Sequence, residues 1–201
     1  MTLAGSLVAA VGLCVGACTA PPAADAPPSS ASAPAEAAPT TAWFVERATE
    51  SGLVFTHVNG ASGKYFYPEI LPLGVALLDF DADDDLDVFV VQGHTLGGTR
   101  AQGDAASGGQ LFRNDLHVAA DGRRTLRFTN VTAASGLVAT GYGMGAATGD
   151  IDNDGDVDLY VMNFGPNQMF RNNGNGTFTD VTKESGTANQ PGFAVSAAFL
   201  D

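Results

Sequence analysis

The sequence predicts an all-β fold, a β-propeller, because one unit of short strands recurs along the chain of 201 residues. Three stretches align without gaps: FVERATESG, FTNVTAASG and FTDVTKESG, which begin at Phe44, Phe128 and Phe178. The later two begin about 50 residues apart, which is the length of a propeller blade of four short strands. A β-sandwich also consists of short strands, but it would not repeat them in phase.

Each unit is predicted to hold four strands in a fixed order. A short apolar strand leads into an aspartate-rich loop, after which residues 88–91 and 159–162 are β-branched, aromatic or apolar, as in strands. A strand containing F-R-N follows, at 111–115 and 169–173, and the aligned F-x-x-V-T stretch supplies the fourth. The order is the same in both units, so we expect two equivalent blades.

The segments between the strands are a tight turn in the second unit and two insertions in the first. The sequence NNGNGTF at 172–178 predicts a tight hairpin turn, because Asn and Gly tolerate the positive φ that such turns need. The first unit is longer than the second because it contains insertions at 95–109 and 117–124.

The negative charge of the chain is concentrated in two places. The formal net charge is −13, and half of the 22 acidic residues lie in the windows 79–87 and 150–158. No basic stripe is present to meet phosphates, which argues against nucleic acid as a partner.

The first eighteen residues, MTLAGSLVAAVGLCVGAC, form an apolar run that predicts a signal peptide. The run is short for a transmembrane helix, and an Ala/Pro/Ser-rich tract follows it. Its end, VGAC, resembles a lipobox, which predicts cleavage before Cys18 and a lipid anchor on that residue. The signal predicts a secreted or cell-envelope protein. Residue 19 is Thr and not Asp, which argues against retention at an inner membrane and favours the outer membrane or the surface. Because no Lys or Arg precedes the run, a plain secretory signal and an uncleaved anchor remain as alternatives.

Three parts make up the predicted domain organisation. Residues 1–18 are the lipoprotein-type signal peptide, and 19–42 are a linker with too few large apolar residues to fold. Residues 43–201 are the propeller. Both cysteines lie in the first part, so the folded domain has no disulfide bond.

The loop DIDNDGDVD predicts a calcium site. Its aspartates and one glycine stand at loop positions 1, 3, 5, 6, 7 and 9: Asp150, Asp152, Asp154, Gly155, Asp156 and Asp158. Hard oxygen ligands on alternate residues of a tight loop suit the six to eight ligands of Ca²⁺, whereas Mg²⁺ tends to keep its waters. We expect the backbone carbonyl of Asp156 and the side chains of the other four aspartates to bind the ion. The sequence does not fit an EF-hand, because position 12 is Val161 and strands flank the loop.

The loop DFDADDDLD predicts a second site of the same kind, although a solvated acidic turn is the alternative for both loops. Its candidate ligands are Asp79, Asp81, Asp83, Asp85 and Asp87. Asp84 stands where the other loop has glycine, and aspartate reaches the left-handed region at a cost of about 1 kcal/mol. We therefore expect the loop to close despite this substitution.

These loops and their surroundings resemble known repeats. DIDNDGDVDLYVMN, the preceding GMGAATGD and the following MFRNNGNGTFTDVT are similar to the FG-GAP/VCBS repeats of integrin-α-type propellers. The stretch from Phe44 to Asp81 resembles the amino-terminal segment of the cartilage acidic protein family, whose members usually end in an ASPIC/UnbV domain. The resemblance covers residues 43–201 and implies an extracytoplasmic, calcium-binding propeller of seven blades. The chain departs from the family at Asp84, Pro72 and Leu73, where glycine is usual.

Enzyme chemistry is not predicted. The three histidines are scattered, no Ser lies in a nucleophile elbow, and Cys18 is outside the fold, so no triad can be assembled. We expect a module that binds an unidentified protein or glycan partner. The alternative is a propeller enzyme of the lyase or phosphodiesterase type, with its active residues in other blades. Four polar residues before the first loop either line a ligand surface or are ordinary loop residues: His57, Asn59, Lys64 and Glu69.

The repeat count predicts an amino-terminal fragment of a longer propeller. The chain holds two whole units and the start of a third at Asp201, whereas closed propellers need four to eight blades. Residues 44–52 match the end of a unit but have no strands before them, so we expect them to pair with a distant part of a longer chain.

Overall fold

A computed structural model describes residues 44–71, 74–96, 108–188 and 192–200. The predicted signal peptide, linker and lipidation site therefore lie outside the described residues. Apart from Phe44 and Val45, the described residues belong to one compact unit, Glu46–Asp201. Among them, no helix has the length and apolar character that crossing a membrane would require.

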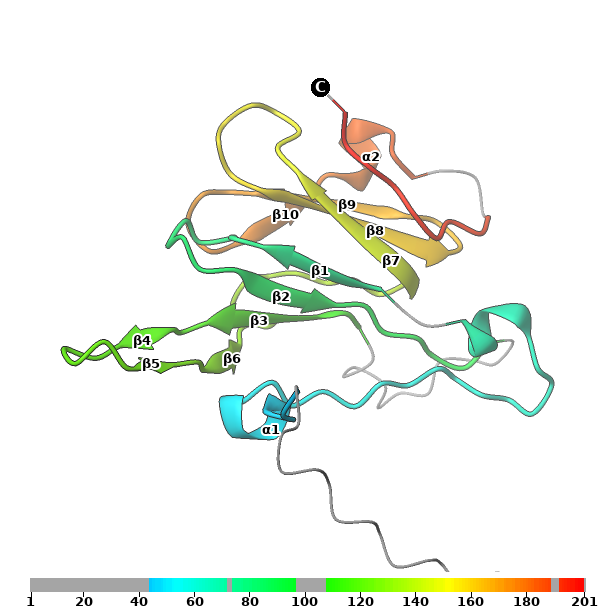
Figure 1. Cartoon of the computed structure of the whole chain (residues 1–201). Helices are drawn as coiled ribbons and strands as arrows, with labels where there is room; N and C mark the ends of the chain where they lie inside the picture. The colour runs from blue at the N-terminus through cyan, green and yellow to red at the C-terminus, as the bar shows by residue number, and fades with distance from the viewer. Residues whose placement is uncertain (1–43, 72–73, 97–107, 189–191, 201) are drawn as a thin grey trace, which may run out of the picture. The chain divides into compact units, whose positions relative to one another are not determined.

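Two four-stranded antiparallel sheets form this unit (Figure 1). The first sheet has the order β1-β2-β3-β6, with bounds Val75–Leu78, Asp87–Val90, Gln110–Asn114 and Phe128–Asn130. The second consists of β7, β8, β9 and β10, with bounds Tyr142–Gly149, Asp158–Phe164, Gln168–Asn172 and Phe178–Asp180. In both sheets the spatial order follows the chain order, as in a propeller blade. The predicted all-β, propeller-type fold with four strands in each unit is confirmed.

The two sheets also share their register. Phe112 of the first F-R-N strand pairs with Val88, and Phe170 of the second pairs with the equivalent Leu159. One irregularity distinguishes them, a register shift between Gly143 and Gly145 where β7 pairs with β8. The strands beside the two acidic loops are therefore built in the same way.

The aligned stretches end in the same one-turn structure. In each stretch, the backbone N–H of a serine donates to the carbonyl four residues earlier. The N···O distance is 2.8 Å for Ser51, 2.8 Å for Ser135 and 2.9 Å for Ser185. The next residue is a glycine with positive φ, of 87°, 70° and 67° at Gly52, Gly136 and Gly186. The first and last turns are the short helices α1, Ala48–Ser51, and α2, Thr182–Ser185. Residues 44–47, expected to resemble a fourth strand, form no strand among the described residues.

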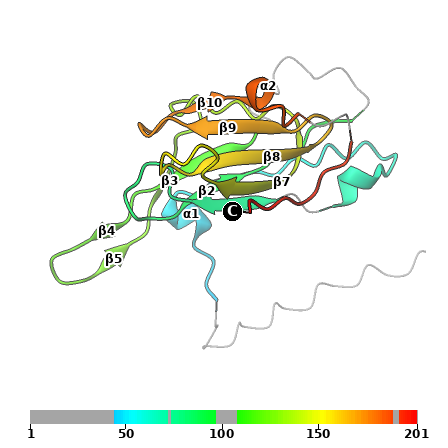
Figure 2. The same ribbon diagram turned by 90° about the horizontal axis from the view of Figure 1, so that it is seen from above.

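Smaller elements lie around the first sheet. The second insertion folds into a hairpin of β4, His117–Val118, and β5, Arg124–Thr125, which projects from the sheet (Figure 2). The 3₁₀ helix η1, Tyr67–Ile70, precedes β1 and lies at the end of the sheets opposite the acidic loops (Figures 1 and 2).

The hydrophobic core lies between the two sheets, where β1 packs against β7. The first sheet contributes Leu78, Phe89 and Leu111, and the second contributes Leu159 and Phe170, all nearly inaccessible to solvent. Gly74 allows close approach, because a Cβ atom there would lie 2.6 Å from the Cα of Gly145. This packing fixes the loops that join the first two strands of each sheet.

Candidate metal centres

Two acidic loops occupy equivalent positions in the two sheets. The first acidic loop, residues 79–87, joins β1 to β2, and the second acidic loop, residues 150–158, joins β7 to β8. Both lie at the same end of the sheets, on the left in Figure 1. Since both connect antiparallel neighbours in the same register, their first and ninth residues flank a strand pair in the same way.

In each loop, aspartate side chains near the start accept hydrogen bonds from backbone N–H groups of the same loop. In the second acidic loop, Asp150 accepts the N–H groups of Asp154 and Gly155 at 3.2 and 2.9 Å, and Asp154 accepts that of Asp156 at 3.0 Å. These bonds lower the pKa of Asp150, with the Gly155 N–H as the main cause. The loop is thereby held closed with the Asp150 side chain ionised.

The first acidic loop repeats this network. Asp79 accepts the N–H groups of Asp83 and Asp84 at 3.2 and 3.0 Å, and Asp83 accepts that of Asp85 at 2.9 Å. Asp84 has a φ of 68° where Gly155 has 94°, so the predicted left-handed aspartate is confirmed. One residue that the sequence did not predict, Ala82 at position 4, is also left-handed, with a φ of 59°.

The aspartate at position 9 of each loop is fully buried. Its side chain accepts hydrogen bonds from the start of the loop and from the F-R-N strand. Asp87 accepts the Phe80 N–H at 3.0 Å and the Asn114 N–H at 2.7 Å. Asp158 accepts the Ile151 N–H and the Asn172 N–H, both at 2.7 Å. Burial raises the pKa of Asp87 to about 6 despite these hydrogen bonds.

Burial likewise raises the pKa of Asp158, against the effect of its two backbone hydrogen bonds. A buried carboxylate that stays ionised needs compensating positive charge as well as hydrogen bonds. Each ninth position is therefore a place where a cation would be stabilising.

Three carboxylates converge in each loop. Oxygen atoms of Asp79, Asp81 and Asp87 lie within 4.8 Å of one another, and the same holds for the equivalent Asp150, Asp152 and Asp158. The carboxylates of the other candidate aspartates are not part of these two clusters: Asp83, Asp85, Asp154 and Asp156. The ligand predicted at Asp156 is its backbone carbonyl, which stays a prediction. Asp83 and Asp154 each accept a loop N–H with one oxygen.

The clusters fit a hard divalent cation. Carboxylate oxygens are the ligands that Ca²⁺ prefers, and three of them converge in each loop. The Arg113 guanidinium near the first cluster is paired with Asp115 at 2.7 Å and only partly offsets the negative charge around Asp81. Oδ1 of Asp81 is buried and has no hydrogen-bond partner, and such an atom normally costs about 1–3 kcal/mol. Burial, followed by the neighbouring Asp83, raises the pKa of Asp81. A cation held by this cluster would remove both penalties.

The two clusters differ in how far solvent reaches them. Asp79 and Asp81 are half-buried, whereas Asp150 and Asp152 are exposed. The turn at 172–177, which follows β9, lies against the first acidic loop, and the two line a shared pocket of about 450 Å³. The first cluster is thus partly covered by the second sheet.

The polar residues before the first loop have structural partners. Asn59 donates to the Glu69 carbonyl at 3.0 Å, and the buried Glu69 side chain accepts the Ser62 N–H at 3.2 Å. The hydroxyl of Tyr142, which the sequence analysis did not single out, donates to the Asn59 carbonyl at 2.7 Å. These contacts hold the segment before β1 against the second sheet, while Lys64 is exposed and His57 stacks on Phe55.

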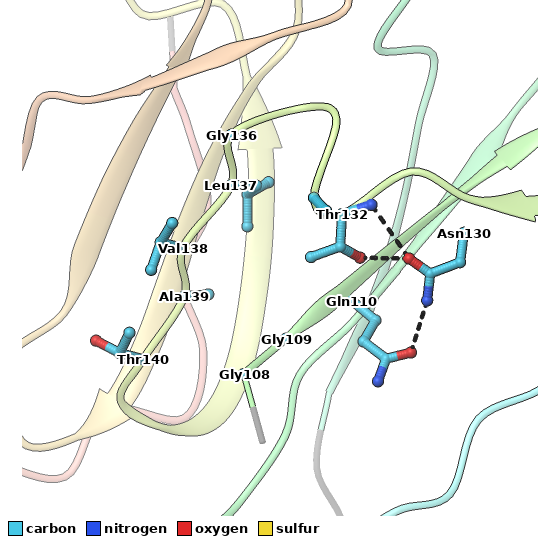
Figure 3. A pocket seen from close by; sticks show the side chains of 11 residues that line it. Gly108, Gly109, Gln110, Asn130, Thr132, Gly136, Leu137, Val138, Ala139 and Thr140 are labelled. Carbon is cyan, nitrogen blue, oxygen red and sulfur yellow. Dashed lines mark hydrogen bonds between the residues drawn. The ribbon is translucent and has the colours of Figure 1, made fainter. Parts of the chain in front are cut away.

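A further pocket of about 360 Å³ lies between the start of β3 and residues 136–140 (Figure 3). On one side Asn130 donates to Gln110 at 3.0 Å and accepts the Thr132 hydroxyl at 2.8 Å. Leu137 lines the other side. Among the described residues, the lining contains hydroxyl and amide groups but no acidic, basic or thiol side chain.

Comparison with known proteins identifies part of the chain. No curated protein matches it. Among protein families, residues 150–201 match the FG-GAP-like repeat, a range that contains the second acidic loop and strands β8, β9 and β10. The first sheet has the same strand order and register and the same loop. The chain therefore carries an FG-GAP-like repeat within an all-β fold of the propeller type.

Proposed function

We propose that the protein is a calcium-binding propeller module that binds a protein or glycan partner outside the cytoplasm. The observation that carries the calcium assignment is the convergence of three carboxylates in both loops, with a buried and unpartnered oxygen on Asp81. In this proposal Ca²⁺ offsets the repulsion between the carboxylates and holds the loops closed. The clustered aspartates supply the ligands: Asp79, Asp81 and Asp87 in one loop, and Asp150, Asp152 and Asp158 in the other.

The partner-binding role is supported by the opposite end of the sheets. The segment around η1 exposes aromatic rings there, with Tyr65 and Tyr67 83% and 62% accessible. Aromatic side chains of this kind supply much of the contact area at interaction sites.

Calorimetric titration of chelator-treated protein with Ca²⁺ tests the metal assignment. We expect two bound ions, and none after replacement of two aspartates in each loop, Asp79→Asn and Asp81→Asn with Asp150→Asn and Asp152→Asn. Asp121→Asn, the same chemical change in the β4–β5 hairpin, is the control and should bind two ions.

Thermal melting gives a second measurement of the same proposal. Calcium at 100 times its dissociation constant should stabilise the fold by about 2.7 kcal/mol per site, and chelator should reverse this. An unchanged midpoint and no heat of binding would refute the calcium proposal. Equal responses to Mg²⁺ and Ca²⁺ would refute the choice of metal.

We also propose that a lipid on Cys18 anchors the protein to a membrane of the cell envelope. The support is the lipobox-like VGAC at the end of the apolar run and the proline-rich stretch that follows. Cys18→Ala should move the protein from the membrane fraction to the soluble fraction, whereas Cys14→Ala should not. Unchanged fractionation of the Cys18 variant would contradict the anchor.

A further inference from the structure

Asn172 forms hydrogen bonds to both acidic loops. We propose that its side chain couples them, so that a cation bound in one loop raises the affinity of the other. This inference rests on the proposed function, because it concerns the same two cation sites.

The side chain of Asn172 reaches the first acidic loop. Its amide nitrogen donates to the carbonyl of Phe80 at 2.8 Å, across 92 residues of sequence, and the residue is 1% exposed. Phe80 stands between Asp79 and Asp81, two members of the first cluster. Its N–H in turn donates to Asp87, the third member. The backbone of Phe80 is therefore fixed by the cluster at its N–H and by Asn172 at its carbonyl.

The same residue belongs to the second acidic loop. The backbone N–H of Asn172 donates to the buried Asp158 at 2.7 Å, and its side chain donates to the carbonyl of Val157 at 3.3 Å. Its side-chain oxygen accepts the Gly174 N–H at 3.1 Å. Gly174 itself lies against the loop, because a Cβ atom there would be 2.4 Å from an oxygen of Asp156. Asn172 and its turn are thus held between both loops.

Asn114 provides an internal comparison in the first sheet. It occupies the equivalent position, donates its N–H to Asp87 at 2.7 Å and its side-chain amide to the Leu86 carbonyl at 3.1 Å. These bonds match those of Asn172 to its own loop. Within the described residues Asn114 bonds no other acidic loop, and its side-chain oxygen is buried without a partner.

Coupling follows from shared ordering. A cation in the first cluster fixes the backbone of Phe80, between Asp79 and Asp81. The fixed Phe80 carbonyl in turn orders the Asn172 side chain, which donates to it. The backbone of Asn172 then holds Asp158 in place before the second cation arrives. Binding of the second ion then costs less conformational entropy. By thermodynamic linkage, an ion in the second loop raises the affinity of the first loop by the same factor.

Calcium titration of the purified chain and of two single-loop variants measures the coupling. One variant carries Asp79→Asn and Asp81→Asn, and the other carries Asp150→Asn and Asp152→Asn. If the loops are coupled, the product of the two wild-type dissociation constants is smaller than the product of the single-loop constants. We expect a factor of about five or more. In the Asn172→Ser background, where the shorter side chain no longer reaches Phe80, the two products should be equal.

Asn114→Ser is the matched control, because it removes a side-chain bond to one loop only and should keep the coupling factor. Equal products in the wild-type background would overturn the coupling while leaving calcium binding intact, and this measurement does not depend on Asn172→Ser being folded. Loss of coupling in Asn114→Ser as well as in Asn172→Ser would overturn the assignment to Asn172. A wild-type chain that binds no Ca²⁺ would overturn the proposed function together with this inference.

Discussion

Asp84 holds a backbone conformation that glycine holds in the equivalent loop. Its φ is 68°, compared with 94° for Gly155, and its exposed side chain adds a negative charge to a loop that already has five other aspartates. The left-handed region costs a non-glycine residue about 1 kcal/mol, and like charges at short range add to this cost. The residue is therefore a point of strain in the first acidic loop.

Asp84→Gly should stabilise the calcium-free protein by on the order of 0.5–1 kcal/mol, because it relieves both penalties and keeps the N–H that Asp79 accepts. Thermal melting in chelator would measure the gain. Asp121→Gly, a change to glycine at a residue without positive φ, should give no such gain. A lower midpoint for Asp84→Gly than for the wild type would contradict this account.

The sequence was informative about single residues where their chemistry limits their conformations. Alternating aspartates with a glycine or aspartate at position 6 predicted the loops and the left-handed Asp84. Asn153 at position 4 carries a comparable signal, but Ala82, with the same φ of 59°, does not. Which carboxylates converge was not predictable either, because that depends on the folded loop. Asp150 and Asp154 both accept loop N–H groups, but only Asp150 belongs to the cluster.

Strands, turns and loops follow from local patterns when their partners are close in sequence. All eight strands of the two sheets were expected from the repeated unit, and their order matches. The one-turn helices were missed, although serine followed by glycine at the end of each stretch is a helix-terminating signal. The hydrogen bond from Asn172 to Phe80 depends on how the two sheets pack, so no local sequence pattern predicts it.

The turn at 172–177 offers a prediction at this scale, since it contains two left-handed glycines with different surroundings. Gly174 has a φ of 66°, and a Cβ atom added there would lie 2.4 Å from an oxygen of Asp156. Gly176 has a φ of 78°, and the nearest atom to a Cβ added there would be 3.9 Å away. Alanine at either position should cost about 1 kcal/mol of backbone strain. Gly174→Ala should cost more than Gly176→Ala, because its methyl group also meets the Asp156 carboxylate of the second acidic loop and forces that side chain to shift.

Paired melting scans and calcium titrations of the two alanine variants would separate these contributions. We expect the larger loss of stability for Gly174→Ala, together with weaker calcium binding at the second loop only in that variant. Equal losses in the two variants would mean that the turn does not press on the loop.

At the scale of the whole unit, one side of β1 is covered and the other is not. Ala76 and Leu78 are 8% and 2% exposed because they face the second sheet. Val75 and Leu77 alternate with them and are 59% and 55% exposed. The second sheet is better covered, since the ring of Phe199 lies against Gly149: a Cβ atom added there would be 2.6 Å from the ring. The outer side of β1 is thus an exposed apolar strip, whereas Val88 and Phe112 on the same face of the sheet are buried.

Exposed apolar surface of this kind favours association between molecules, so we expect residues 43–201 to form oligomers whose mass rises with protein concentration. Static light scattering over a range of concentrations would measure it. Leu77→Lys should shift the protein towards the monomer by placing a charge on the exposed side of β1. Val118→Lys, at a residue that is 52% exposed on the β4–β5 hairpin, should leave the mass unchanged. A wild-type protein that stays monomeric and melts cooperatively at every concentration would show that this surface does not drive association.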